Sequence, residues 1–342
     1  MSKKHSLLSM LFMGLITIGI VCAQEAPTPQ QALKSFGVSA EQIRQLESGE
    51  IISYEVSETS QKELAIGVAM ILPANLAKII EYIKSGRLTT TKIDMITTVV
   101  LDSSAKGLKK FAFTEKDVDE AKSFLNAEPG DEFNLSQQEL DSLKSAQAPL
   151  KTADNKTLLT VASQKYREFL IQRFKSYRKG GLAGIAAYSR ENGIADPGEE
   201  LHIDALRSKG WTNYFPELQQ IWLNYPAAIP VNSVEQFVWM NCRVEDRPTA
   251  ILNHQITFTN DQIGVILSRE FYVGHSYNSS QVIAGGIPYD EGTLVFYTIH
   301  SSTDQVAGIG VKLKHLIGRD KMKEEMIKRL HQLNADLILN QH

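Results

Sequence analysis

The segment from Phe237 to Val306 constrains the fold of this chain more than any other. It is a succession of short runs rich in β-branched and aromatic residues, and pairs such as Asn-Asp, Gly-Gly and Glu-Gly separate these runs. Runs of this kind, divided by turn-forming residues, predict an antiparallel β-sheet. The same runs carry polar side chains at positions that a purely structural core would avoid. The segment therefore predicts a sheet and, within it, the place to look for a functional site.

The N-terminus predicts a cleavable signal peptide over residues 1–23. Lys3 and Lys4 provide a basic start, an apolar run extends from Leu7 to Val21, and Ala23 occupies the position before the cleaved bond. An uncleaved membrane anchor is the alternative, but the apolar run is shorter than the roughly 20 residues that a membrane helix requires. We therefore expect a secreted or periplasmic protein.

Composition argues against two further classes of protein. The chain has 342 residues and a formal net charge of −3, and a mildly acidic balance argues against nucleic acid as a partner. Cleavage of the signal peptide would remove Cys22, so Cys242 is the only thiol expected in the mature protein. An internal disulfide is then impossible, and stability has to come from the hydrophobic core.

Outside the opening segment, the sequence predicts an N-terminal leader at 24–50, two strand regions, a helical block and a closing helix. Pro73 ends one strand and is favourable at the first position of a following helix. Besides a short strand at 51–56, strands are predicted at 62–72, 93–101, 235–244, 250–258, 263–273, 281–285 and 293–300. The closing helix has an apolar stripe that must pack against the sheet; the stripe consists of Met322, Met326, Leu330, Leu333 and Leu337.

The block at 103–230 predicts helices, of which the longest extends from Asn155 to Lys179. One side of that helix is apolar and the other is basic. The basic side could contact anionic lipids at a membrane surface or another acidic partner, although a solvated face is the commoner role of such a surface. The basic residues are Lys165, Arg167, Arg173, Lys175, Arg178 and Lys179.

The order of these elements resembles the START-like helix-grip superfamily, which includes lipid-transfer START domains, polyketide cyclase-like proteins and the birch-pollen-allergen fold. The resemblance rests on the strand that breaks through Ile-Leu-Pro-Ala at 71–74, on the run of antiparallel strands, and on the long helix after Gly-Thr-Leu-Val-Phe-Tyr at 292–297. It covers residues 51–102 and 231–340 and leaves 103–230 as a helical insertion or lid, a departure from the family's layout. It implies an α+β fold in which a curved antiparallel sheet of about seven strands grips the C-terminal helix.

Three of the predicted strands each place one basic or imidazole side chain among apolar neighbours. Because side chains alternate along a strand, His254, Arg269 and His300 share faces with apolar residues. Along 263–273 the shared face is Val265, Leu267, Arg269, Phe271 and Val273. A buried charge or ring nitrogen requires a partner, so Glu270, Asp246 or Asp304 is expected nearby.

These polar groups could orient the head of an otherwise hydrophobic ligand. Satisfied hydrogen bonds in the core, or positions at strand ends, are the alternative. Aromatic residues concentrate around the same strands and could line the mouth of an apolar pocket. The predicted ligand-binding residues are Trp239, His254, Arg269, Phe271, Tyr272, His275, Tyr277, Phe296 and His300.

Catalytic, metal and cofactor motifs are not recognised in the sequence. His275 lies beside Ser276 in a Gly- and Ser-rich link, but neighbours in sequence rarely have the geometry of a nucleophile and its base, and no Gly-x-Ser-x-Gly motif is present. His202 and Asp204 do not form a ligand pair on one helical face, so neither a metal nor another cofactor is predicted.

Two hypotheses of function follow. The first is an exported, non-enzymatic carrier or binding protein for a lipid or other hydrophobic small molecule, with its cavity between the sheet and the C-terminal helix. The second is a hydrolase or cyclase of the cell envelope on the same scaffold, in which His275 or His254 is the general base and Asp246 or Glu270 its partner. The positions of these groups in space distinguish the two.

Overall fold

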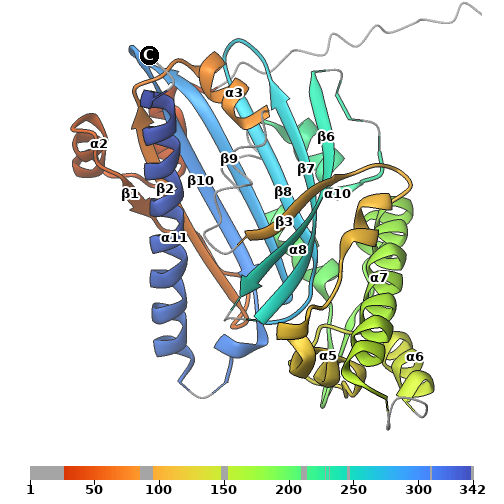
Figure 1. Ribbon diagram of the computed structural model, residues 1–342. Helices are drawn as coiled ribbons and strands as arrows, with labels where there is room; N and C mark the ends of the chain where they lie inside the picture. The colour runs from red at the N-terminus through yellow and green to blue at the C-terminus, as the bar shows by residue number, and fades with distance from the viewer. Residues whose placement is uncertain are drawn as a thin grey trace, which may run out of the picture.

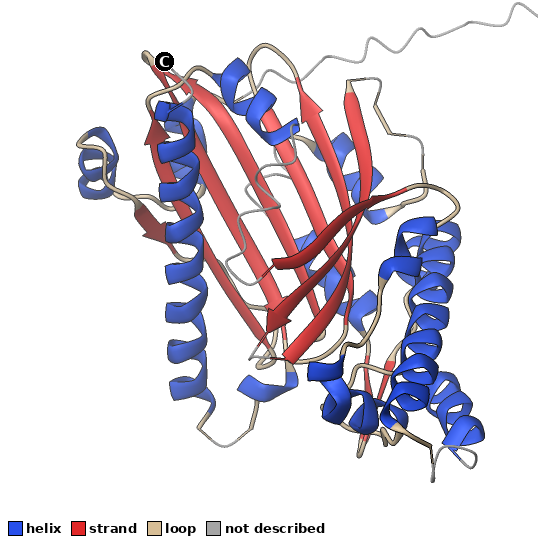
Figure 2. Cartoon of the chain, viewed as in Figure 1, coloured by secondary structure: helices blue, strands red, loops and turns tan. Residues whose placement is uncertain are grey.

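The computed structural model describes residues 27–84, 95–147, 153–208, 214–227, 229–230, 232–244, 247–308 and 310–339. The expected signal peptide lies outside these residues. Within them the fold is α+β, as predicted: a curved antiparallel sheet that does not close into a barrel carries helices on both faces and ends in a long C-terminal helix (Figures 1 and 2). No helix of the described part is at once long and apolar enough to cross a membrane.

The large sheet has eight strands, all paired antiparallel, in the order β1-β2-β10-β9-β8-β7-β6-β3. Strands β6 to β10 form a meander, whereas β2 and β3, which follow each other in the chain, lie on opposite sides of it. The predicted strands are all present. Their bounds are β1 (Ile52–Tyr54), β2 (Glu63–Leu72), β3 (Met95–Leu101), β6 (Ser233–Val244), β7 (Arg247–Thr259), β8 (Gly264–Val273), β9 (Ser279–Tyr289) and β10 (Gly292–Ser302).

The described part of the chain also contains nine α-helices, a small hairpin and short 3-10 helices. The hairpin consists of β4 (Tyr188–Arg190) and β5 (Gly193–Ala195). The helices are α1 (Pro29–Ser35), α2 (Ala40–Glu47), α3 (Leu76–Lys84), α5 (Val118–Leu125), α6 (Gln137–Gln147), α7 (Asn155–Gly180), α8 (Pro197–Arg207), α10 (Pro216–Leu223) and α11 (Val311–Leu339).

The helix after β2 begins later than the sequence predicts. Pro73 was expected at its first position, but α3 begins at Leu76, because the side chain of Asn75 accepts a hydrogen bond from the backbone N–H of Lys78 at 3.0 Å and so caps the helix. Pro73 instead lies in the turn between β2 and α3.

Helix α11 packs on one face of the sheet, against β2, through the apolar stripe that the sequence predicts. Met326, Leu330, Leu333 and Leu337 are buried there in one cluster with Val68, Met70 and Leu72 of β2. We call this face the α11 face. The opposite face contacts α8 and α10, whose Ala205, Leu218 and Trp222 pack on Val265, Leu267 and Ile283. We call it the α8 face.

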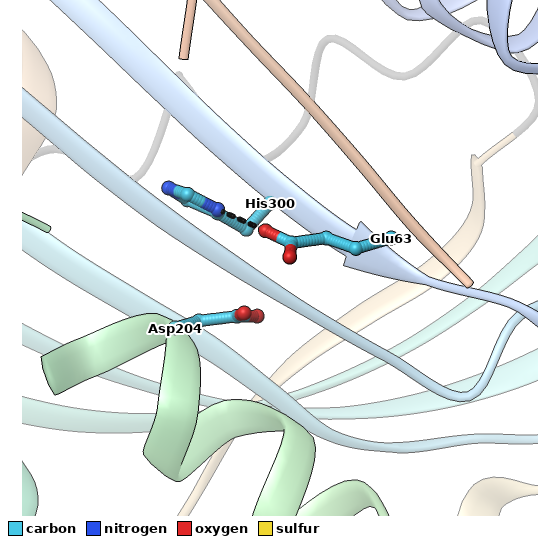
Figure 3. A group of neighbouring side chains, drawn as sticks. All are labelled: Glu63, Asp204 and His300. Carbon is cyan, nitrogen blue, oxygen red and sulfur yellow. Dashed lines mark hydrogen bonds and ion pairs between the residues drawn. The ribbon is translucent and has the colours of Figure 1, made fainter. Parts of the chain in front are cut away.

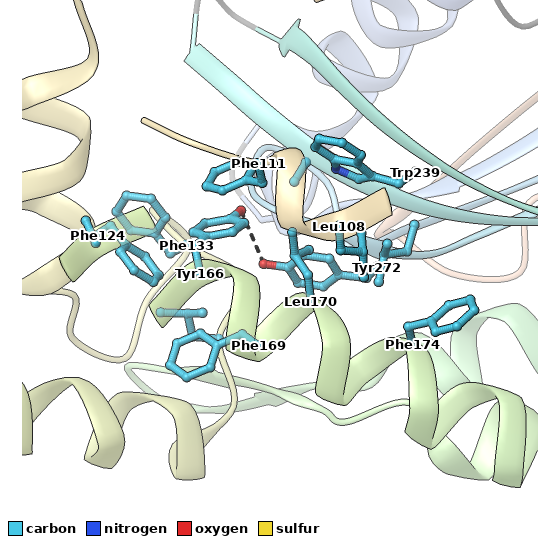
Figure 4. Packing of buried hydrophobic residues seen from close by; sticks show 14 of the residues in the cluster. Leu108, Phe111, Phe124, Phe133, Tyr166, Phe169, Leu170, Phe174, Trp239 and Tyr272 are labelled. Carbon is cyan, nitrogen blue, oxygen red and sulfur yellow. Dashed lines mark hydrogen bonds between the residues drawn. The ribbon is translucent and has the colours of Figure 1, made fainter. Parts of the chain in front are cut away.

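The helical block packs on the sheet through a continuous core rather than through a polar boundary. Aromatic residues of the block, such as Phe111 and Tyr166, belong to the same buried cluster as Trp239, Leu252 and Tyr272 of the sheet (Figure 4). The rings of Phe111 and Tyr166 are stacked with centroids 4.5 Å apart. The block at 103–230 and the strands thus share one hydrophobic interior.

A β-bulge in β8 changes the side-chain pattern from the one expected. Leu252 pairs with Tyr272 and Asn253 pairs with Glu270, so Phe271 is an extra residue without a partner in β7. Phe271 and Tyr272 both enter the cluster on the α8 face. Val273 lies on the opposite face, in the cluster of Val238 and Ile251, so the prediction that Val273 shares a face with Arg269 is wrong.

The basic side of α7 is also less exposed than the sequence predicts. Arg173 is buried and donates to Glu139 at 2.8 Å, with its guanidinium 4.4 Å from the centre of the Tyr272 ring. Arg167 donates to the carbonyl oxygen of Phe111. Both residues form hydrogen bonds within the helical block, and Arg173 is buried there.

Candidate functional site

Four buried polar side chains form a row across the α8 face. His300 of β10 lies directly opposite Gln281 of β9, Gln281 opposite Arg269 of β8, and Arg269 opposite His254 of β7. None of the four is more than 2% exposed. Because directly opposite residues have Cβ atoms about 4.5–5.5 Å apart, these side chains form a continuous line perpendicular to the strands. We call it the polar row.

At one end of the polar row, His254 is held between a tyrosine and a carboxylate. Its Nε2 lies 3.0 Å from Glu235 Oε1 and its Nδ1 lies 2.8 Å from the Tyr177 hydroxyl. The carboxylate can only accept, so Nε2 carries the proton and Nδ1 accepts from Tyr177. Burial lowers the pKa of His254, which keeps the ring neutral. The carboxylate partner of His254 is therefore Glu235 rather than the expected Glu270. The other expected partner, Asp246, lies outside the described residues.

In the middle of the row, Arg269 is bound by neutral groups. It donates to the Tyr177 hydroxyl at 3.2 Å and to the carbonyl oxygen of Trp222 at 3.1 Å, and its guanidinium lies 4.1 Å from the centre of the Trp222 ring. Trp222 Nε1 in turn donates to Gln281 Oε1 at 2.7 Å. No ion pair joins Arg269 to a carboxylate of the described residues, and its Nε has no hydrogen-bond partner there.

At the other end of the row, three side chains with oxygen and nitrogen donors converge. His300 Nδ1 lies 2.6 Å from Glu63 Oε1, and Asp204 extends from α8 toward Glu63 (Figure 3). One donor atom from each of Glu63, Asp204 and His300 lies within 4.8 Å of the other two. We call these three residues the Glu63–Asp204–His300 group; all three are buried.

The two carboxyl groups of this group differ in charge. Burial raises the pKa of Asp204 to about 8, and the neighbouring carboxylates of Glu63 and Glu200 add to the effect. Burial also acts to raise the pKa of Glu63, but hydrogen bonds from His300 and Thr59 outweigh it and lower the pKa overall. At neutral pH Asp204 therefore holds a proton and Glu63 is ionised.

A second polar network lies beside the group and fixes the start of β9. Arg190 donates to Asp304 at 2.7 Å and to the side-chain oxygens of Asn134 and Asn278. Glu200 of α8 accepts from Asn278 and Ser279 at 2.9 and 2.8 Å. Asp304 was expected to pair with one of the buried basic side chains of the strands, but it pairs with Arg190.

His275 lies in the link between β8 and β9 and has a hydrogen-bond network of its own. Its Nε2 is 2.7 Å from Thr249 Oγ1, and its Nδ1 is 2.6 Å from Ser276 Oγ. Since the Thr249 hydroxyl donates to the carbonyl oxygen of Arg247, it accepts from Nε2, and Nδ1 accepts from Ser276. Burial and the charge of Arg247 lower the pKa of His275 to about 4. Ser276 has a positive φ of 73°.

The remaining predicted ligand-binding residues lie mostly in the core. Phe271 stacks on Tyr177 with ring centroids 4.0 Å apart, and the Tyr272 hydroxyl donates to that of Tyr166 at 3.3 Å. Trp239 and Phe296 are buried in the two clusters of the α8 face. Tyr277 is different, because it is half-buried and packs against the cluster on the α11 face, where its hydroxyl donates to Glu270 at 2.7 Å.

The α11 face presents a half-buried surface over the central strands. Side chains directly opposite one another form two lines across β7 to β10, and every one of them is half-buried. We call them the α11-face surface. The first line is Thr257, Ile266, Ala284 and Tyr297, and the second is Gln255, Ser268, Val282 and Ile299.

The polar row and the α11-face surface lie on opposite faces, so His254, Arg269 and His300 do not line a cavity between the sheet and the C-terminal helix. The interior beneath α8 and α10 is also closely packed. A cavity lined by Phe215, Trp222 and Leu267 has a volume of about 20 Å³, and one beside α1 has about 10 Å³. A water molecule needs roughly 10–15 Å³, so neither cavity admits a lipid.

Two parts of the site were missed by the sequence-based predictions. Gln281 was available as a polar residue inside an apolar run, and the pairing of β9 with β8 and β10 is what places it in the polar row. Glu63 and Asp204 meet His300 only through the fold. Comparison with known proteins adds no further assignment: no family model, curated protein or solved structure matches this chain.

Proposed function

We propose that this protein is an exported, non-enzymatic binding protein for a lipid-like, amphiphilic small molecule, which it holds on the α11-face surface. The observation that carries the proposal is the half-buried apolar character of that surface at the centre of the sheet. An antiparallel sheet with one face in water normally alternates apolar and polar residues, so that its wet face is polar. Here the corresponding positions include Ile266, Val282 and Ala284.

Polar groups around these apolar residues suit the head of an amphiphile. Gln255 and Ser268 lie in the second line of the surface, next to Val282. Glu270 and Tyr277 form a hydrogen-bonded pair on the same face. Arg329 of α11 lies near both: burial lowers its pKa, but the neighbouring Tyr297 hydroxyl and Glu270 carboxylate raise its pKa overall. Apolar walls with a few placed polar groups are typical of small-molecule sites.

The layout of the chain supports the same location. The first long strand, β2, pairs with the last strand, β10, and α11 follows β10 and packs back on β2. The resemblance to the helix-grip superfamily implies a ligand between the sheet and that helix. Tyr277 lies on this face and remains a predicted ligand-binding residue, whereas His254, Arg269 and His300 lie on the other face, away from the hydrophobic ligand.

The test is binding of a fluorescent fatty-acid analogue to the purified full-length protein, with native mass spectrometry for ligands that co-purify. Ala284→Arg places a charge in the α11-face surface and should weaken binding at least tenfold. Ala335→Arg, at an exposed position of α11, is the matched control and should bind as the wild type does. Equal affinity of the two variants, with no ligand co-purifying, would contradict the proposal.

A hydrolase is the second candidate, and the hydrogen bond between Ser276 Oγ and His275 Nδ1 favours it. A serine hydroxyl that donates to an imidazole is the arrangement of an activated nucleophile. The pKa of about 4 makes His275 a weak base, which is why we place this candidate second. Labelling by a fluorophosphonate probe that disappears in Ser276→Ala would support it, and no labelling of the wild type would dismiss it.

A further inference from the structure

The Glu63–Asp204–His300 group joins three elements that are far apart in the chain. Glu63 is the first residue of β2, Asp204 lies on α8, and His300 lies near the end of β10. In Figure 3 the carboxyl of Asp204 faces that of Glu63, and one ring nitrogen of His300 bonds to Glu63. The three side chains therefore meet at one point beneath α8, on a face of the sheet where none of them reaches solvent.

Asp204 has a buried oxygen atom, Oδ2, to which no group of the described residues donates a hydrogen bond. The residue is only 2% exposed. A buried carboxyl oxygen without a hydrogen-bond donor is unfavourable, and here it lies beside the carboxylate of Glu63. A divalent cation that takes the place of the Asp204 proton would be bound by both carboxyl groups.

The donor set is one that divalent transition metals prefer. Two carboxylates and one imidazole suit Zn²⁺, Mn²⁺ and Fe²⁺ better than Ca²⁺ or Mg²⁺, which favour oxygen alone. The ligating nitrogen would be His300 Nδ1, because Nε2 points away from both carboxylates (Figure 3). Bonds to zinc of about 2.0–2.2 Å require the side chains to adjust. His300 Nδ1 and Glu63 Oε1, now 2.6 Å apart, must separate, and the wider donor distances within the spread of up to 4.8 Å must shorten.

Hydrogen bonds from Thr59 already orient Glu63, one of the three proposed metal-binding side chains. Glu63 accepts hydrogen bonds from both the backbone N–H and the hydroxyl of Thr59. Partners of this kind orient the carboxylates of metal sites. Glu200, one turn before Asp204 on α8, is engaged by Asn278 and Ser279 and is not needed as a ligand.

We propose that Glu63, Asp204 and His300 bind a divalent transition-metal ion, with Zn²⁺ as the ion to test first. Its role is structural, because the group is buried on the face opposite the α11-face surface and connects β2, β10 and α8. This site is independent of the proposed ligand binding, and either can fail without the other.

The experiment measures metal binding by the full-length protein after treatment with a chelator and dialysis. Titration calorimetry with ZnCl₂ should show one ion per chain, and saturating zinc should raise the thermal midpoint by roughly 5 °C. Asp204→Asn keeps the size of the side chain and should weaken binding at least a hundredfold. Glu199→Gln, an exposed carboxylate on the same helix, should bind zinc as the wild type does.

The competing explanation is a proton shared between Asp204 and Glu63 without any metal. That explanation holds if the wild type binds neither zinc nor manganese, or if Asp204→Asn binds zinc as tightly as Glu199→Gln does, and either result overturns the proposal. Should Asp204→Asn fail to fold, His300→Gln serves in its place, with the same expected loss of zinc binding.

Discussion

The two faces of the large sheet are built from the same strands but differ in how deeply their side chains are buried. On the α8 face Arg269 and Gln281 have no exposed surface, and their partners are other protein groups. On the α11 face their neighbours Ser268 and Val282 are half-buried. Adjacent residues of a strand point to opposite faces, so this difference reflects what covers each face rather than the composition of the strands.

The comparison shows that buried polarity need not mark a ligand site. The polar row contains the residues that looked most functional in the sequence, yet Tyr177 of α7, Asp204 of α8 and Trp222 of α10 lie against it. The hydrogen bonds of its side chains go to other protein groups. No residue of the α11-face surface was singled out in the sequence, yet its apolar residues are left half-buried. Paired substitutions, one on each face at neighbouring positions, can test this difference between the faces.

The largest expected effect is at Arg269 and Ser268, which are adjacent in β8 and point to opposite faces. Arg269→Ala removes a buried guanidinium and leaves the carbonyl oxygen of Trp222 without its donor. We expect it to lower the free energy of unfolding by about 3–5 kcal/mol, against less than about 1 kcal/mol for Ser268→Ala. Urea denaturation of both variants measures this difference. Similar losses would mean that the two faces do not differ as described.

Acidification should destabilise the protein through His275. Its pKa is about 4 in the folded protein and 6.5 without the fold, so the unfolded chain takes up a proton first as the pH falls. The stability is complete above pH 6.5 and declines between pH 6.5 and 4, by about 3 kcal/mol in total for this residue. Urea denaturation across this range should show the decline in His331→Gln, an exposed control on α11, and a shallower one in His275→Gln. Parallel pH profiles of the two variants would contradict the assignment.

The smallest effect concerns two isoleucines on neighbouring strands. Ile283 of β9 is buried on the α8 face, whereas Ile266 of β8 is half-buried on the α11 face. Ile283→Val should cost about 0.5–1.5 kcal/mol of unfolding free energy, and Ile266→Val less than about 0.5 kcal/mol. Thermal or urea denaturation is sensitive enough to rank them. If the order is reversed, the α11-face surface is packed more tightly than the α8 face.

The sequence was sufficient to predict the elements and some of their faces. Alternation and turn residues predicted the strands, and the stripe from Met326 to Leu337 predicted which side of α11 is buried, because both patterns are local. The assignment of His254 and His300 to buried positions was likewise confirmed, since each lies between apolar neighbours in its own strand.

Features that depend on residues distant in the chain could not be predicted. The polar row requires the registers of four strands at once, and the Glu63–Asp204–His300 group requires β2, α8 and β10 to meet. The bulge at Phe271 is a single extra residue that no periodic pattern reveals. Whether a face is covered by α8 or by α11 also depends on how the helices return to the sheet.

The pairing of β2 with β10 has a consequence for how the chain reaches its fold. More than two hundred residues separate the two strands, and the ten paired positions between them can form only after every residue through β10 has been made. Contacts between such distant segments slow folding. Until β10 arrives, the apolar strand Glu63–Leu72 lacks its main partner and could associate with other chains. A newly made molecule should therefore depend on a holding chaperone for longer than the meander of β6 to β10 alone would need.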